Sequence, residues 1–206
     1  MKILIIFGTR PEAIKMAPLV RELSKSFHVV ICVTAQHREM LDQVLELFNI
    51  NPDHDLDIMK PGQDLYDLTS NVLLSVKEVL SAENPNIVLV HGDTTTTMAT
   101  SLAAFYQRIP VGHVEAGLRT YNIHSPFPEE MNRRFCDSVS KYLFAPTLKS
   151  KEFLLNENFD ESKIFITGNT VIDALLDTAS KKYTIKNRTL KKIPFDSKRI
   201  ILVTAH

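Results

Sequence analysis

The sequence has 206 residues, of which 44% are hydrophobic and 23% charged, and its 24 basic and 24 acidic side chains give a formal net charge of zero. This balance is typical of a soluble globular protein and gives no electrostatic basis for binding nucleic acid or an anionic membrane. The length predicts one complete domain with an extension.

The chain opens with MKILIIFG, in which five apolar residues follow a single lysine. A signal peptide or a membrane span needs a longer apolar run, so we expect a cytoplasmic protein. Cys32 lies in an apolar run and Cys136 lies on an expected helix. Two such cysteines are typical of buried free thiols in a reducing compartment rather than of a disulfide framework.

Short apolar runs rich in β-branched residues alternate with segments of helical period over most of the chain. Two of these segments, 40–48 and 65–79, carry apolar stripes that we interpret as the core faces of helices. Pro11 suits the first turn of a helix directly after the first apolar run. The alternation predicts an α/β protein with a Rossmann-like, doubly wound parallel sheet. Strands are expected at 3–7, 29–33, 56–58, 87–90, 111–114, 142–145 and 164–167.

The last part of the chain has a different character. A helical segment at 169–180 is followed by a basic, polar stretch at 181–198 without clear period, which favours a solvated connector. RIILVTAH at 199–206 then has the composition of a strand. We therefore expect a first domain at 1–168, and at 169–206 a connector with the first strand of an incomplete second domain.

The turn after the first expected strand contains Gly8, Thr9 and Arg10 and leads into a helix. Glycine permits close approach of a ligand, a helix N-terminus presents free N–H groups, and arginine makes forked hydrogen bonds to phosphate oxygens. These properties fit a diphosphate site. An ordinary tight turn with a surface arginine explains the same residues equally well, and without GxGxxG the turn gives no support for dinucleotide binding.

A second polar cluster, His91, Gly92 and Asp93, follows the expected strand at 87–90, and four threonines come next. Because the carboxyl ends of parallel strands share one edge, these side chains could converge with the first turn on one crevice and contact sugar hydroxyls. The alternative is that Asp93 or Thr94 simply caps the next helix.

Further carboxylates follow the next expected strand. Glu115 comes directly after 111–114, where a carboxylate usually has partners, and Glu129 and Glu130 begin a helix. A solvated helix start, favoured by the helix dipole, accounts for at least one of the latter two.

Metal binding and two common catalytic mechanisms are disfavoured by the motifs. His91 with Asp93, and His113 with Glu115, alternate along expected strands, but the sequence contains no HExxH, CxxC or dense carboxylate loop, so no metal site is predicted. A Gly-x-Ser-x-Gly elbow and a P-loop are also missing, which argues against a serine hydrolase and a P-loop kinase.

Six ordered motifs resemble the non-hydrolysing UDP-N-acetylglucosamine 2-epimerases of bacteria. They are GTRPEAIKMAPL, TAQHREMLDQV, LVHGDTTTTMATSLAAFY, PVGHVEAGLRT, PEEMNR and FITGNTVIDAL. The resemblance implies the N-terminal half of a glycosyltransferase-B fold, in which two Rossmann-like domains face a cleft. It also implies a homodimer without a cofactor, and a uridine pocket that belongs mainly to the second domain, so this chain alone should lack full activity.

The family reaction implied by the resemblance is epimerisation at C2 of the sugar, which supplies UDP-N-acetylmannosamine for cell-surface polysaccharide. The proton at C2 is only weakly acidic, so the expected route eliminates UDP to give 2-acetamidoglucal and then adds UDP back. Which carboxylate removes the proton stays open at this stage. The resemblance assigns catalysis to Asp93, Glu115, Glu129 and His206, substrate binding to Arg10, Lys15, His91 and Arg133, and allosteric binding of a second substrate molecule to Gln36 and His37.

Two alternatives remain open from the sequence. A hydrolysing epimerase or a nucleotide-sugar glycosyltransferase of the same fold would share much of this layout. The chain could also be an inactive domain that only binds ligand or dimerises.

Overall fold

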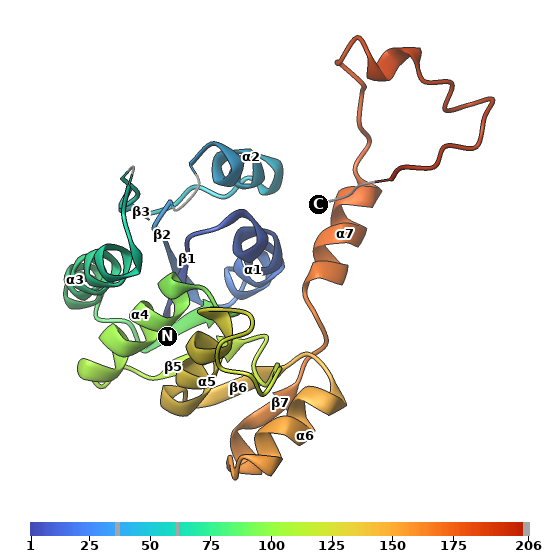
Figure 1. Ribbon diagram of the computed structural model, residues 1–206. Helices are drawn as coiled ribbons and strands as arrows, with labels where there is room; N and C mark the ends of the chain where they lie inside the picture. Colours follow the sequence, from blue (N-terminus) through green and yellow to red (C-terminus); the bar gives the residue numbers. More distant parts are fainter. Residues whose placement is uncertain (36–37, 61, 204–206) are drawn as a thin grey trace.

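The computed structural model describes residues 1–35, 38–60 and 62–203, and within them all strands form one parallel sheet in the order β3-β2-β1-β4-β5-β6-β7 (Figure 1). The chain winds outward from β1 in both directions, so the switch point lies between β1 and β4. Ligands of such sheets bind at this point, beyond the carboxyl ends of the strands. The strands are β1 (Lys2–Phe7), β2 (His28–Val33), β3 (His54–Asp55), β4 (Ile87–His91), β5 (Val111–Val114), β6 (Tyr142–Ala145) and β7 (Ile164–Ile166).

Helices cover both faces of the sheet, as expected for a doubly wound fold (Figure 1). In β1, Ile5 packs with α1 and α2 on one face, whereas Ile6 packs with α3 and α4 on the other. Burial on both faces explains why this strand is apolar throughout. The helices are α1 (Arg10–Leu23), α2 (Arg38–Phe48), α3 (Leu65–Glu83), α4 (Thr95–Tyr106), α5 (Glu129–Val139), α6 (Leu148–Asn156), α7 (Val171–Ser180) and the 3₁₀ turns η1 (Glu161–Lys163) and η2 (Leu190–Lys192).

Six of the seven expected strands are confirmed, and the third was placed wrongly. The structure has β3 at His54–Asp55 instead of a strand at 56–58. Asp57 has a φ of 41°, which interrupts the extended conformation. Ile58 is nevertheless buried, against the α3 side of the core, so its apolar character reflects packing rather than strand pairing.

The segment after the sheet begins with α7, which packs against α1 through an ion pair between Arg21 and Asp177. The connector at 181–198 is mostly exposed, as predicted. The strand predicted for 199–206 as the first of a second domain stays a prediction. Residues 199–203 form no regular structure, Ile201 to Val203 are at least 80% exposed, and in the described part of the chain they pair with no neighbouring strand. Residues 204–206 lie outside the described residues.

Both cysteines are buried free thiols, as expected. Burial, with the nearby charge of Asp55, raises the pKa of Cys32 to about 12, and burial also raises the pKa of Cys136. Neither thiol is therefore an activated nucleophile. Across residues 1–35, 38–60 and 62–203, none of the helices has both the length and the apolar character needed to cross a bilayer.

Candidate functional site

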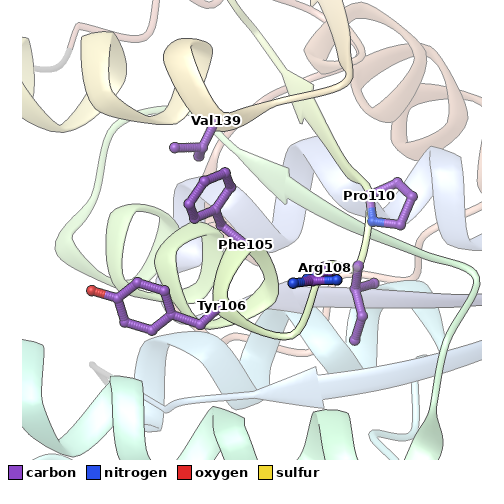
Figure 2. A pocket seen from close by; sticks show the side chains of 6 residues that line it. Phe105, Tyr106, Arg108, Pro110 and Val139 are labelled. Atoms are coloured by element: carbon purple, nitrogen blue, oxygen red, sulfur yellow. The ribbon is translucent and has the colours of Figure 1, made fainter.

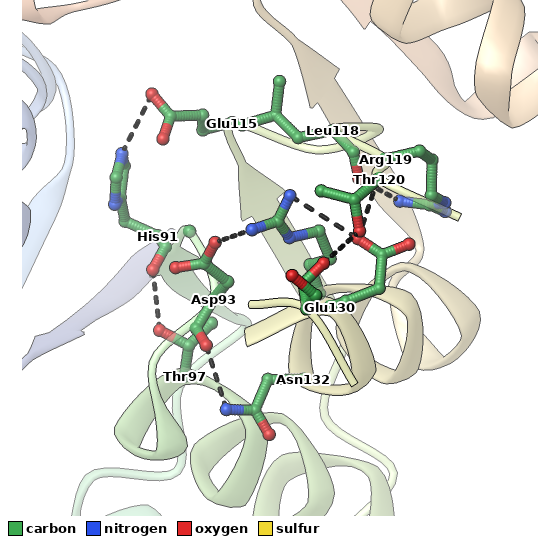
Figure 3. Close-up of polar contacts among 12 residues, drawn as sticks. His91, Asp93, Thr97, Glu115, Leu118, Arg119, Thr120, Glu130 and Asn132 are labelled. Carbon is green, nitrogen blue, oxygen red and sulfur yellow. Dashed lines mark hydrogen bonds and ion pairs between the residues drawn. The ribbon is translucent and has the colours of Figure 1, made fainter. Parts of the chain in front are cut away.

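Three turns meet at the carboxyl edge of the sheet. They follow β1, β4 and β5, which are neighbours. Figure 3 shows the contact between His91, the last residue of β4, and Glu115, which follows β5. The sequence analysis expected these clusters to lie at the same edge of the sheet, and the order of the strands places them there. Side chains also connect the segments that follow β1, β4 and β5 to one another.

Glu12, in the first turn of α1, joins the turn after β1 to the turn after β4. It is 2% exposed. Its Oε2 accepts hydrogen bonds from the backbone N–H groups of Gly8 (2.9 Å) and Thr9 (2.7 Å), and its Oε1 accepts from the hydroxyls of Thr94 (2.7 Å) and Thr97 (3.0 Å). Sequence analysis did not single out this residue, although the Thr9-x-x-Glu12 capping box was visible as a signal.

The threonine run has mainly a structural role. Thr94 caps α4 by accepting a hydrogen bond from the N–H of Thr97, which bears out the capping alternative for Thr94 but not for Asp93. Oγ1 of Thr97 also lies 2.6 Å from the His91 carbonyl oxygen, so its single hydrogen is shared between this carbonyl and Oε1 of Glu12. The run therefore fixes the backbone on both sides of Asp93.

Gly8 permits the closest backbone approach in the site. A Cβ atom at this position would lie 2.2 Å from Oγ1 of Thr34 and 2.9 Å from Oγ1 of Thr96, and both threonines are fully buried. Gly8→Ala should therefore destabilise the protein by about 1–3 kcal/mol through overpacking, measured by urea unfolding. Adding Thr34→Ala to Gly8→Ala removes the closest atom, so the double variant should recover part of the lost stability. If the effects of the two substitutions on the free energy of unfolding simply add, the steric explanation is contradicted.

Glu115 lies in a cluster of donors that keeps it ionised. Lys15 Nζ contacts its two carboxylate oxygens at 2.7 and 2.6 Å, Asn169 donates to Oε2 at 2.7 Å, and Nε2 of His91 lies 3.7 Å away. Burial by itself would raise the pKa of Glu115, but the contacts with His91 and Lys15 outweigh it and lower the pKa to about 2. Glu115 therefore carries a negative charge at every physiological pH.

This lowered pKa gives a pH dependence with a definite sign. Because the folded pKa lies below that of the unfolded chain, ionised Glu115 stabilises the fold above about pH 4.5, and this contribution is lost as the pH falls toward 2. Lys15→Met should lower the free energy of unfolding by roughly 1–2 kcal/mol at pH 7, and by less at pH 3. Urea unfolding at both pH values tests this prediction. A loss of unfolding free energy that is the same at pH 7 and pH 3 would contradict it.

Asp93 has the opposite electrostatic character. Its Oδ2 pairs with Arg133 at 2.5 Å and its backbone carbonyl accepts from Asn132 at 2.9 Å (Figure 3). Burial raises the pKa of Asp93 in spite of Arg133, and the nearby charges of Glu129 and Glu115 raise it further. Asp93 is therefore better suited to exchanging protons near neutral pH than Glu115 is.

The two glutamates at the start of α5 have different surroundings. Glu130 is fully buried and accepts from the N–H groups of Thr120 (3.0 Å) and Tyr121 (3.1 Å). A solvated helix start was expected for at least one of the two glutamates, and it does not describe Glu130, because its buried carboxylate caps a loop. Glu129 is half-buried, and its Oε2 is buried without a hydrogen-bond partner among the described residues, which leaves a carboxylate oxygen for a ligand beside Asp93.

The predicted site residues fall into two adjacent clusters and several separate positions. Arg10 is exposed at the N-terminus of α1 and forms no ion pair with a described carboxylate. Gln36, His37 and His206 lie outside the described residues. Lys15, His91 and Glu115 form one cluster, and Asp93, Glu129 and Arg133 form the other.

A hollow of about 490 Å³ lies elsewhere, at the amino edge of the sheet (Figure 2). It is near the end of α4 and the start of β5, and its lining within the described residues includes none of the predicted site residues. No group of three or more potential metal ligands occurs among residues 1–35, 38–60 and 62–203. The lining residues are Phe105, Tyr106, Arg108, Ile109, Pro110 and Val139.

Comparison with known proteins identifies the family. The family model described as UDP-N-acetylglucosamine 2-epimerase matches residues 21–206. The chain belongs to the UDP-N-acetylglucosamine 2-epimerase family. The Escherichia coli K12 enzyme of that name is 58% identical over the whole of this chain, and the Neisseria meningitidis serogroup A enzyme is 57% identical. The chain spans about half the length of the curated relatives it matches, namely 57% of each of these two.

Solved structures of the epimerase family share the fold. The Neisseria meningitidis UDP-GlcNAc 2-epimerase bound to UDP-GlcNAc has a TM-score of 0.87 and 58% identity, over 93% of this chain and 52% of that one. The Methanocaldococcus jannaschii enzyme in complex with UDP-GlcNAc and UDP has a TM-score of 0.83 and 40% identity, over 93% of this chain and 52% of that one. MurG of Acinetobacter baumannii, 14% identical with a TM-score of 0.56, shares the fold alone. The chain thus has the N-terminal, Rossmann-like half of a glycosyltransferase-B fold.

Proposed function

We propose that the protein carrying this chain interconverts UDP-N-acetylglucosamine and UDP-N-acetylmannosamine by inverting C2 of the sugar. The observation that carries the proposal is the pair of carboxylates with opposite pKa shifts, Asp93 and Glu115, at the carboxyl edge of β4 and β5. Two carboxylates whose environments separate their pKa values suit a division between proton transfer and charge stabilisation. The family relationship supports the same reaction.

The reaction proceeds by elimination and re-addition. A base takes the C2 proton, the C–H electron pair forms the C1–C2 double bond, and the C1–O bond breaks so that UDP leaves with its electron pair. The intermediate is 2-acetamidoglucal. In the second half a proton is added to C2 from the opposite face, and a UDP oxygen bonds to C1. Positive charge grows at C1 while the C1–O bond breaks, so a fixed negative charge nearby lowers the barrier.

The two clusters divide these tasks. Glu115, ionised by its contacts with Lys15 and His91, stabilises the positive charge at C1. Asp93, whose pKa is raised, and Glu129, whose Oε2 lacks a partner among the described residues, exchange protons on the two faces of C2. Inversion requires a proton-transfer group on each face, or one that moves between them.

Substrate contacts follow from the same turns. Arg10 and the N-terminus of α1 are placed to bind the diphosphate, since backbone N–H groups and a guanidinium both suit phosphate oxygens. Lys15, His91 and Arg133 border the carboxylates and are assigned to sugar and phosphate contacts. The Neisseria meningitidis relative was solved with UDP-GlcNAc bound, which supports this substrate class.

Other features of the protein are part of the same proposal. We place a domain boundary at residue 168, assign the uridine pocket and His206 to a second domain, and expect a cytoplasmic homodimer that supplies surface polysaccharide synthesis. Gln36 and His37 are assigned to an allosteric substrate molecule.

Proton NMR of the full-length protein with UDP-N-acetylglucosamine in D₂O tests the function. The expected result is UDP-N-acetylmannosamine with one deuterium at C2. Free N-acetylmannosamine together with UDP would instead indicate a hydrolysing epimerase, and transfer of the sugar to an added acceptor a glycosyltransferase. Calorimetric binding of UDP-N-acetylglucosamine without turnover would indicate an inactive binding protein.

A further inference from the structure

A chain of buried polar contacts leads to the turn that carries Asp93. His113, on β5, is fully buried, with Nε2 at 2.7 Å from the Gly92 carbonyl and Nδ1 at 2.7 Å from Oδ1 of Asp137 on α5. The other oxygen of Asp137 lies 2.7 Å from NH1 of Arg119, whose side chain is also fully buried. His113 thus connects a charged pair in the interior to a single peptide group beside Asp93.

The hydrogen-bond roles around His113 follow from its partners. A carbonyl oxygen can only accept, so Nε2 carries a hydrogen and donates it to Gly92. At the other nitrogen one proton lies between Nδ1 and Oδ1 of Asp137, whichever atom holds it. The ring is therefore fixed at both ends, and its orientation fixes the position of the Gly92 carbonyl.

The Gly92 carbonyl belongs to the peptide group that immediately precedes Asp93. Gly92 has a φ of +69°, and a Cβ atom built on it would have nothing within 4 Å, so no side chain packs against Gly92 at that position. Hydrogen bonds hold it instead: the Gly92 N–H donates to the Val114 carbonyl at 2.9 Å, and the carbonyl accepts from His113. On the far side, Asn132 donates to the Asp93 carbonyl.

We propose that His113 is a positioning residue for Asp93, and that it acts by holding the Gly92 carbonyl. The inference rests on the proposed function, in which Asp93 exchanges a proton at C2. His113 itself is fully buried, and both of its ring nitrogens are engaged by Asp137 and Gly92. A misplacement of about 1 Å in a reacting group can cost about 10²-fold in rate, so the effect of losing this hydrogen bond should appear in kcat more than in KM.

Two amide substitutions distinguish the two hydrogen bonds of His113, because each keeps one bond and removes the other. In His113→Gln the amide nitrogen takes the place of Nε2 and can still donate to Gly92. In His113→Asn it takes the place of Nδ1 and can still donate to Asp137. Each variant removes one of the two buried hydrogen bonds and keeps the other, so the comparison isolates the bond to Gly92. His28→Asn, at an exposed position, serves as the control.

The full-length protein is assayed for epimerisation by NMR, with kcat and KM measured separately and thermal melting measured for each variant. We expect His113→Gln to keep kcat within about fivefold of the unsubstituted protein and His113→Asn to lower kcat by about 10²-fold with KM within about threefold. His28→Asn should match the unsubstituted protein.

Equal losses of kcat in the two variants, a larger loss in His113→Gln, or losses that follow melting temperature would overturn the positioning role. Failure of both variants to fold would also overturn it, because His113 would then be needed for stability rather than for placing Asp93. If the unsubstituted protein does not epimerise the substrate, the proposed function is wrong and the role of His113 in it is withdrawn. If the unsubstituted protein is active and the two His113 variants lose kcat equally, only the proposed role of His113 is contradicted.

Discussion

Asp93→Asn should lower the rate of epimerisation by about 10²- to 10⁴-fold, the usual cost of losing a positioned acid or base. The amide can still accept the hydrogen bond from Arg133, so the geometry of the turn should persist. Stability should not fall with activity, because burial raises the pKa of Asp93 and the ionised form is therefore unfavourable in the folded protein at pH 7. We expect a free energy of unfolding within about 1 kcal/mol of the unsubstituted value, or higher.

NMR turnover and urea unfolding of the same preparation measure both effects. Asp160→Asn is the matched control, because Asp160 is exposed before β7, at the amino edge of the sheet, and its hydrogen bonds with Ser162 are ones that an amide oxygen also accepts. Turnover of Asp93→Asn within threefold of the control would remove Asp93 from the mechanism.

Arg119→Met should be the most damaging single change to stability, with a loss of about 3–5 kcal/mol. The side chain of Arg119 is fully buried between Asp137 (2.7 Å) and Glu157, to which it makes two hydrogen bonds of 2.8 Å. Burial by itself would lower the pKa of Arg119, but the bonds to Glu157 and the charge of Asp137 raise it instead. Methionine fills a similar volume but leaves the buried carboxylate of Asp137 without its cationic partner.

Arg134→Met is the control for this prediction, because Arg134 contacts the same Glu157 at 3.9 Å but is 43% exposed. Exposed ion pairs contribute at most about 1 kcal/mol. Urea unfolding at pH 7 compares the two variants. Similar small losses would mean that the buried network adds little to stability.

Most of the sheet could be predicted from the sequence because its strands are buried on both faces. Such strands are continuous apolar runs, as in 3–7 and 87–90, and these stand out from the amphipathic helices between them. The prediction at 56–58 was wrong because burial alone also produces an apolar run. The left-handed conformation of Asp57 had no signal strong enough to exclude a strand.

The candidate site was predictable to the extent that its residues follow strands. Asp93 comes two residues after β4 and Glu115 directly after β5, so topology alone brings them to one edge. Their opposite pKa shifts were not predictable, because burial raises the pKa of Asp93 whereas contacts with His91 and Lys15 lower that of Glu115, and both effects arise only in the folded structure.

The buried polar network beneath the site could not be inferred from the sequence either. His113 and Asp137 are 24 residues apart, and nothing in either local pattern indicates their pairing. Each lies in a segment whose period explains burial but not the identity of its partner. Glu12 differs, because its capping box was readable; only its bonds to the threonines of the next turn needed the folded structure.

The start of α7 has a practical consequence for shortening the gene. Asn169 donates to the Glu115 carboxylate at 2.7 Å, and the hydroxyl of Thr170 donates to the Lys15 carbonyl at 2.6 Å. A polypeptide cut after residue 168 would lose both donors, together with the helix that covers α1. A recombinant version of the first domain should therefore include Asn169 and Thr170, although they follow the boundary placed at residue 168, because a product that ends at 168 would have an altered environment at Glu115.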